Sequence, residues 1–131
     1  LDAVVVPVGG GGLIAGIATV VKELSPSVEV IGVEPEECAS LTAAIAAGKP
    51  VQVPFTGTLA DGLAVPTIGQ NAFEICQEKV DRVVTVSEAS VALAVLRLLE
   101  QHNTLVEGGG AAGFAALSEL VFGGIFFTVT I

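Results

Sequence analysis

The stretch Ala3-Val4-Val5-Val6-Pro7-Val8-Gly9-Gly10-Gly11-Gly12-Leu13, near the start of the chain, says most about the fold. An uninterrupted apolar run of this kind is typical of a parallel β-strand that is buried on both faces of its sheet. Four glycines then break the strand, and an apolar segment continues from Leu13 to Leu24. The stretch therefore predicts a strand, a glycine turn and a helix in direct succession.

The same alternation of strand-like and helix-like segments continues along the chain, which is typical of an α/β protein. Ser40 is expected to cap a short alanine-rich helix that ends at Gly48, and Ser87 to cap a longer helix. The expected strands span residues 3–8, 28–33 and 80–86, and the expected helices span residues 13–24, 41–48, 71–78, 88–102 and 111–120. The sequence thus predicts one α/β domain.

The length and charge of the chain argue against some classes of protein function. The chain has 131 residues, enough for one domain with a core of its own. Its 14 acidic and 5 basic residues give a net charge of -9. A nucleic-acid-binding protein needs a basic surface to replace phosphate counterions, so the charge argues against nucleic acid as a partner. No apolar run reaches the roughly 18–20 residues that cross a bilayer, and no membrane span is expected.

The apolar content is high for a domain that forms its whole surface alone. Apolar residues make up 52% of the chain and the mean hydropathy is +0.82. The chain also starts at Leu1, directly before the first expected strand. We expect it to be part of a larger protein whose other parts cover the surplus apolar surface. Cys38 and Cys76 are too few for a disulfide framework or a zinc site, and they favour reduced thiols in the cytoplasm.

The four glycines are the strongest functional signal. Glycine lets the backbone approach a ligand closely, and the N–H groups at a helix N-terminus attract anions, so a phosphate is the expected guest. A plain turn is the alternative. A P-loop is excluded, because Leu13 and Ile14 stand where it needs Lys and Ser or Thr. The pattern Gly10-x-Gly12-x-x-Ala15 also matches the dinucleotide fingerprint, with Glu34 at the spacing of about 20 residues expected of a ribose-binding acid.

Two further segments combine a carboxylate with glycine. Asp61-Gly62 lies in an apolar loop, and Glu107 directly precedes three more glycines. Turn chemistry explains the first segment equally well, and close packing of a helix on a strand explains the second. A nicotinamide-binding half-domain requires neither of them.

With these segments in view, the chain resembles the large-domain portion of the threonine/serine dehydratase (ammonia-lyase) and serine racemase group, which are fold-type II enzymes that use pyridoxal 5′-phosphate (PLP). The resemblance runs from Asp2 to about Leu120 and rests on four segments: Val6-Pro7-Val8-Gly9-Gly10-Gly11-Gly12-Leu13, Gly32-Val33-Glu34-Pro35, Ala60-Asp61-Gly62 and Val106-Glu107-Gly108-Gly109-Gly110-Ala111. It implies a partial three-layer sandwich with a mostly parallel sheet. Residues 1–120 would form the incomplete PLP-binding portion, and residues 121–131 a divergent apolar tail.

The resemblance also implies site residues. The cofactor-binding set would be Gly9, Gly10, Gly11, Gly12, Leu13, Asp61, Gly62 and Glu107. Racemase-like members bind a divalent cation, Mg or Ca, and the matching positions are Glu34, the carbonyl of Cys38, and Ser40. Because Ser40 stands where racemases carry a carboxylate, a hard cation loses one of its preferred ligands here.

The implied activity is the PLP-dependent elimination of water from L-threonine or L-serine, which gives a 2-keto acid and ammonia. The lysine that forms the Schiff base with PLP is absent, because Lys22, Lys49 and Lys79 lie outside the family's lysine motif. We therefore expect no catalytic residue in this chain and no activity of the chain alone. The alternatives are a serine racemase, a nicotinamide-binding half-domain and a non-catalytic PLP-binding remnant. The resemblance further implies that the full-length protein is a homodimer or a larger assembly.

Overall fold

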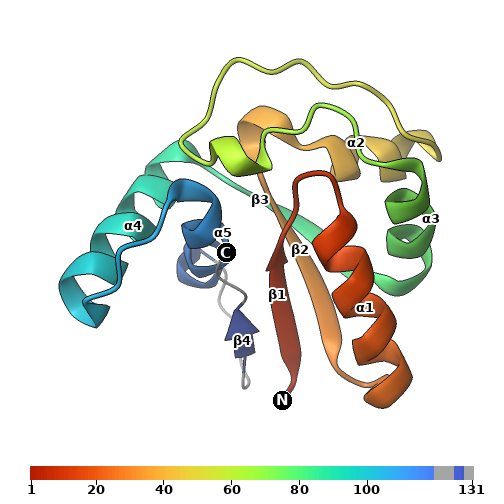
Figure 1. Ribbon diagram of the computed structural model, residues 1–131, viewed down its shortest axis with the longest axis horizontal. Helices are drawn as coiled ribbons and strands as arrows, with labels where there is room; N and C mark the ends of the chain where they lie inside the picture. Colours follow the sequence, from red (N-terminus) through yellow and green to blue (C-terminus); the bar gives the residue numbers. More distant parts are fainter. Residues whose placement is uncertain (120–125, 129–131) are drawn as a thin grey trace.

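The computed structural model describes residues 1–119 and 126–128, and these form a twisted parallel sheet with helices on both faces (Figure 1). The strands are β1 (Ala3–Pro7), β2 (Glu29–Pro35), β3 (Arg82–Val86) and β4 (Phe126–Thr128). Their order in the sheet is β3-β2-β1-β4, and each described pairing is parallel. The predicted α/β class with a parallel sheet is confirmed.

The helices form two outer layers. On one face lie α1 (Gly12–Leu24), α2 (Ser40–Ala47) and α3 (Gln70–Lys79), and on the other lie α4 (Glu88–His102) and α5 (Gly108–Glu119) (Figure 1). Two short 3₁₀ turns, η1 (Glu36–Cys38) and η2 (Asp61–Leu63), connect the elements. The arrangement is the three-layer sandwich that the sequence resemblance implies.

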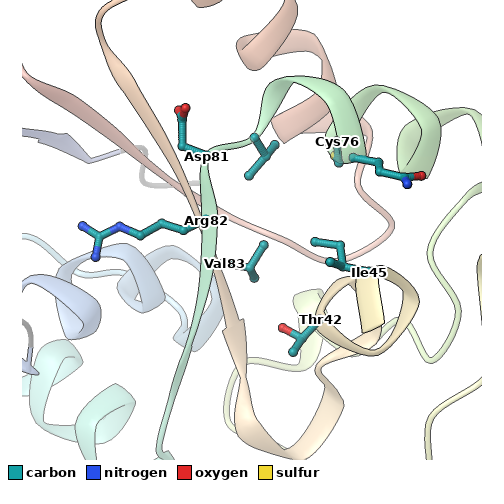
Figure 2. A pocket seen from close by; sticks show the side chains of 8 residues that line it. Thr42, Ile45, Cys76, Asp81, Arg82 and Val83 are labelled. Carbon is teal, nitrogen blue, oxygen red and sulfur yellow. The ribbon is translucent and has the colours of Figure 1, made fainter. Parts of the chain in front are cut away.

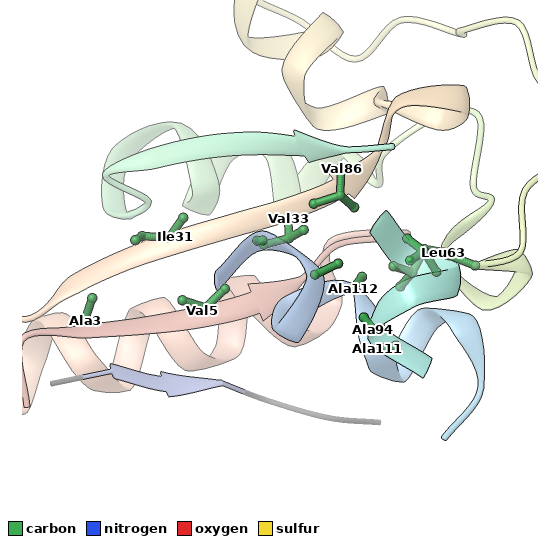
Figure 3. Packing of buried hydrophobic residues seen from close by; sticks show 13 residues of the cluster. Ala3, Val5, Ile31, Val33, Leu63, Val86, Ala94, Ala111 and Ala112 are labelled. Atoms are coloured by element: carbon green, nitrogen blue, oxygen red, sulfur yellow. The ribbon is translucent and has the colours of Figure 1, made fainter. Parts of the chain in front are cut away.

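The alternation of side chains along β1 builds a core on each face of the sheet. Val5 packs into the cluster beneath α4 and α5, while Val4 and Val6 pack into the cluster beneath α1, α2 and α3. Figure 3 shows the first cluster, in which Ala111 and Ala112 of α5 lie close to the strands. Alanines at these positions allow the helix backbone to approach the sheet closely, so both faces of a five-residue strand are buried.

Several element boundaries differ from the sequence prediction, among them the start of β3, which lies at Arg82 and not at residue 80. Strand β2 continues to Pro35, and α5 begins at Gly108, before the expected start at 111. Ser40 lies inside the first turn of α2, and its side chain does not cap that helix. Within the predicted tail, residues 126–128 form β4 beside β1. Residues 120–125 and 129–131 lie outside the described part of the chain, so the boundary predicted at 120 stays a prediction.

Asp81, which directly precedes β3, connects that strand to α1 and to β2. Its Oδ2 accepts hydrogen bonds from Lys22 Nζ in α1 at 2.7 Å and from the Val30 amide in β2 at 2.6 Å. Burial raises the pKa of Asp81, but the hydrogen bonds from Lys22 and from Val30 outweigh it, and the pKa falls below its ordinary value. The folded state therefore favours the ionised carboxylate.

We expect Asp81→Asn to lower the free energy of unfolding at pH 7 by about 1–2 kcal/mol, because the Val30 amide and Lys22 lose their charged acceptor. A depressed carboxyl pKa stabilises the fold above the unfolded-state pKa of about 4, and this contribution is lost as the pH falls below it. The difference between variant and wild type should therefore shrink between about pH 5 and pH 3 in urea unfolding. Glu78→Gln is the control, since Glu78 pairs with Lys79 while 75% exposed. Equal stability of D81N and wild type at pH 7 would contradict the expectation.

Across residues 1–119 and 126–128, no helix combines the length and the apolar character needed to cross a membrane.

Candidate functional site

A hollow of about 170 Å³ lies where β1 ends, and it is lined by Pro7, Gly9, Gly10, Gly11, Gly12, Leu13, Ile14, Gly62 and Leu63. The chain runs from β1 to β2 and β3 on one side and later returns to β4 on the other side of β1. Such a reversal of strand order is the place where open α/β sheets bind ligands, beyond the carboxyl ends of their strands. The hollow therefore lies where the topology favours a ligand.

The backbone amides around the hollow are available to an anion. Helix α1 begins here, with Gly11 as its N-cap and no side-chain hydrogen bond to the cap. The first N–H groups of an α-helix have no partner within the helix and carry its positive dipole end. Within the described residues, none of the amides of residues 9–13 donates a hydrogen bond to a protein acceptor. These unpartnered donors provide a site for a phosphate group.

Three of the four glycines, at positions 10, 11 and 12, fall into two groups by what a Cβ would meet there. Gly11 has a φ of 87°, and a Cβ there would lie 2.8 Å from Ala72 Cβ and from Ile68 Cδ1. The fold itself therefore demands glycine at position 11. At Gly12 a Cβ would meet no heavy atom within 4 Å, and at Gly10 it would meet only Val65 at 3.9 Å. A plain turn does not explain these two glycines, whereas close approach of a ligand to the backbone does.

The structure brings Gly62 and Glu107 together beside the hollow, although they are far apart in the sequence. A Cβ on Gly62 would lie 3.4 Å from Glu107 Oε1, and one on Gly109 would lie 2.5 Å from the same oxygen. Both glycines thus leave room for the Glu107 carboxylate. Asp61 lies next to this contact, where its Oδ1 accepts a hydrogen bond from the Gly62 amide at 2.9 Å. The predicted cofactor residues therefore lie in one neighbourhood, and their roles remain predictions.

The residues expected to bind a cation are arranged differently. Glu34, the residue before the end of β2, is fully buried. Its Oε1 accepts from the Leu41 amide at 2.6 Å, and its Oε2 accepts from the Thr42 amide at 2.9 Å and from Thr42 Oγ1 at 2.7 Å. Burial raises the pKa of Glu34, and these hydrogen bonds oppose the rise. Glu34 therefore caps α2, which is the role predicted for Ser40.

The other two positions add little to a cation site. Cys38 is buried, and burial followed by the nearby Glu34 charge raises the pKa of its thiol. Ser40 Oγ is buried and has no hydrogen-bond partner among the described residues. That part of the chain also holds no group of three His, Cys, Asp or Glu side chains placed to share a metal. One carboxylate with both oxygens hydrogen-bonded fits Mg or Ca poorly, and it is equally unavailable to a ribose.

A second cavity of about 250 Å³ lies away from this site, between α2, α3 and β3 (Figure 2). Its lining includes Thr42, Ile45 and Cys76. Burial, and then the Glu34 charge, raises the pKa of the Cys76 thiol to about 11, so the thiol stays protonated near neutral pH. The lining residues include none of the predicted cofactor-binding residues, and the hollow after β1 remains the candidate functional site.

Sequence reasoning missed one residue near the site, Glu88. Its carboxylate accepts hydrogen bonds from Thr58 Oγ1 and from the Leu59 amide, the latter at 2.7 Å. These residues directly precede the Ala60-Asp61-Gly62 segment. No sequence pattern could have signalled this contact, because Glu88 simply follows a predicted N-cap and the loop is 29 residues away from it.

Comparisons with known proteins show the family of the chain. Residues 1–126 match the family described as pyridoxal-phosphate dependent enzyme. The L-threonine ammonia-lyase of Geobacter sulfurreducens is 53% identical over 114 residues, which cover 87% of this chain and 28% of that protein. The chain thus spans little more than a quarter of that relative's length.

Solved structures show the same fold. The T.th. threonine deaminase superposes with a TM-score of 0.86 at 42% identity, covering 89% of this chain and 43% of that one. Maize serine racemase superposes with a TM-score of 0.84 at 35% identity, covering 88% of this chain and 35% of that one. The family model matches residues 1–126, the sequence and fold similarity covers most of the chain, and the chain belongs to the family of pyridoxal-phosphate dependent enzymes.

Proposed function

We propose that the protein carrying this chain is a PLP-dependent L-threonine or L-serine ammonia-lyase, and that this chain supplies the phosphate-binding part of its cofactor site. The observation that carries the proposal is the hollow after β1, where the unpartnered amides of residues 9–13 meet the N-terminus of α1. The high identity to an L-threonine ammonia-lyase supports the choice of reaction.

In this proposal the chain binds and orients the cofactor. The amides of Gly9, Gly10, Gly11, Gly12 and Leu13 would donate to the phosphate oxygens, and the α1 dipole would favour the phosphate charge. Gly62 and Leu63 would form the opposite wall, with the Glu107 carboxylate beside Gly62. When bound, PLP withdraws electrons from the α-carbon of the amino acid, so that the β-hydroxyl can leave.

The reactive lysine would come from outside this chain. Lys22 is held by Asp81 and by the Val28 carbonyl, and Lys79 pairs with the neighbouring Glu78. Among the described residues no lysine lines the hollow. We therefore expect the 131-residue chain to bind the cofactor phosphate without catalysing elimination.

Phosphate binding is tested with Gly12→Asp. The Cβ at position 12 meets no atom within 4 Å, and an acid in the first turn of a helix is compatible with its dipole, so the variant should fold normally. Its charge should repel the phosphate and weaken PLP binding by more than about tenfold in a fluorescence titration. Gly16→Asp adds the same charge one turn later and is the control. Equal affinity of G12D and wild type for PLP would place the phosphate elsewhere.

A serine racemase is the second candidate, supported by the superposition on the maize enzyme. The two functions are separated in the whole protein that carries this chain. A lyase releases 2-keto acid from L-threonine and L-serine, whereas a racemase converts L-serine to D-serine at a higher rate than it releases the keto acid. Release of keto acid from neither amino acid, with D-serine formed, would replace the lyase proposal by the racemase.

Assembly and location complete the proposal. Leu93, Leu96 and Leu99 are each between 44% and 47% exposed on α4, which supports a covering partner in the whole protein. We propose a homodimer or larger assembly in the cytoplasm.

A further inference from the structure

We propose that Glu88 is a positioning residue that fixes the segment of residues 58–63 and thereby the wall of the hollow formed by Gly62 and Leu63. The inference rests on the proposed phosphate site but concerns a residue outside the lining of the hollow. Glu88 is the first residue of α4, and the segment is a connection that ends in the turn η2.

The first step is that the Glu88 carboxylate accepts two hydrogen bonds from the segment of residues 58–63. Thr58 Oγ1 donates to Glu88 Oε1, and the Leu59 amide donates to Glu88 Oε2 at 2.7 Å. Thr58 Oγ1 also accepts a hydrogen bond from the Ala60 amide at 3.1 Å. Each carboxylate oxygen thus accepts a hydrogen bond from one of two successive residues, Thr58 and Leu59. The Thr58 hydroxyl in turn holds the Ala60 amide in place. Hydrogen bonds to an ionised acceptor are the stronger kind.

The second step is the tight packing of the same segment against α5. A Cβ on Gly108 would lie 2.5 Å from the Leu59 carbonyl carbon and 2.9 Å from the Ala60 nitrogen. The backbone at Leu59 therefore rests directly on the start of α5. Ala60 is fully buried and its carbonyl accepts the Leu63 amide at 2.9 Å, so its position sets the turn that follows.

The third step links the turn to the hollow. A Cβ on Gly9 would lie 3.2 Å from Leu63 Cα and 3.3 Å from the Gly62 carbonyl oxygen. The turn η2 and the glycine turn of residues 9–12 are thus in direct backbone contact. A displacement of the segment would move one wall of the hollow relative to the amides on the other.

Glu88→Gln tests the proposal with little change of shape. A glutamine side chain has an NH₂ group, which cannot accept, in place of one carboxylate oxygen. The variant therefore loses the acceptor at one of the two positions where Thr58 and Leu59 donate. Amide hydrogen exchange of the 131-residue chain should become about tenfold faster at Leu59, Ala60 and Leu63, and at Gly69, whose amide donates to the Gly10 carbonyl at 3.2 Å, and should remain unchanged in α3. The affinity for PLP should fall about tenfold, while the affinity for pyridoxal, which lacks the phosphate, should not change.

Three variants separate positioning from general destabilisation. Thr58→Val removes the hydroxyl without changing the charge and should reproduce the local exchange effect, whereas Thr58→Ser should behave as wild type. Glu100→Gln removes the same charge from an exposed site of α4 and should change neither readout. Wild-type exchange in E88Q, or acceleration spread evenly over the whole chain, would overturn the proposal.

The exchange measurement needs no ligand, so it decides the role of Glu88 independently of the proposed function. Failure of the wild-type chain to bind PLP would refute the phosphate site. Faster exchange confined to residues 58–63, with the Gly69 amide on the Gly10 carbonyl unaffected, would refute the link between Glu88 and the hollow.

Discussion

Gly108→Ala is expected to lower the free energy of unfolding by about 3 kcal/mol or more, because the new methyl group would overlap the backbone at Leu59. The nearest atoms belong to the main chain, which cannot rotate away as a flexible side chain would. Either α5 or the segment of residues 58–63 must move, and both pack on the core cluster that contains Ala60 and Ala111. Urea unfolding followed by circular dichroism measures the loss, which is a large part of the roughly 5–15 kcal/mol typical of a domain.

Gly16→Ala is the matched control for this prediction. A Cβ at Gly16 meets no heavy atom within 4 Å, and the residue lies inside α1 on an exposed surface. Alanine should therefore stabilise the helix by roughly 0.5–1 kcal/mol. A Gly108→Ala variant as stable as wild type would mean that α5 and the segment are not in backbone contact.

Glu34→Ala is expected to cost about 3 kcal/mol, because the amides of Leu41 and Thr42 and the Thr42 hydroxyl lose their only described side-chain acceptor in a buried place. The variant also leaves a cavity between β2 and α2. The effect should appear as a lower midpoint of urea unfolding, together with loss of helical signal if α2 unravels. Glu36→Ala, at an exposed acid two residues later, should change the stability by less than about 0.5 kcal/mol.

The Glu34→Ala variant also tests whether Glu34 caps α2 or binds a cation. If Glu34 caps α2, as its hydrogen bonds indicate, then Mg²⁺ or Ca²⁺ should raise the Tm of neither the wild type nor the variant. A Tm that rises with either cation in the wild type and not in Glu34→Ala would restore the cation site implied by the sequence resemblance.

Local sequence was enough to predict the class of fold, and it also indicated the candidate site. The apolar run before Gly9 is typical of a strand buried on both faces, and four glycines before an apolar helix leave unpartnered amides at its N-terminus. These properties are carried by neighbouring residues, and the strand, the turn and α1 lie where the sequence predicts them. The segments around Asp61 and Glu107 also stand out through their own residues.

Only the tertiary structure decided which of these segments are in contact and which groups their carboxylates bind. The sequence offers Glu34 as a candidate for ribose or a cation, but packing of α2 on β2 buries its carboxylate beneath the helix amides. The glycines at 108–110 are expected to form a turn, yet they open α5, and its first residue lies against the backbone at Leu59, where a Cβ would not fit. The contact of Glu88 with Thr58 joins residues from separate elements. Such pairings depend on the placement of distant segments in space, which sequence neighbours do not specify.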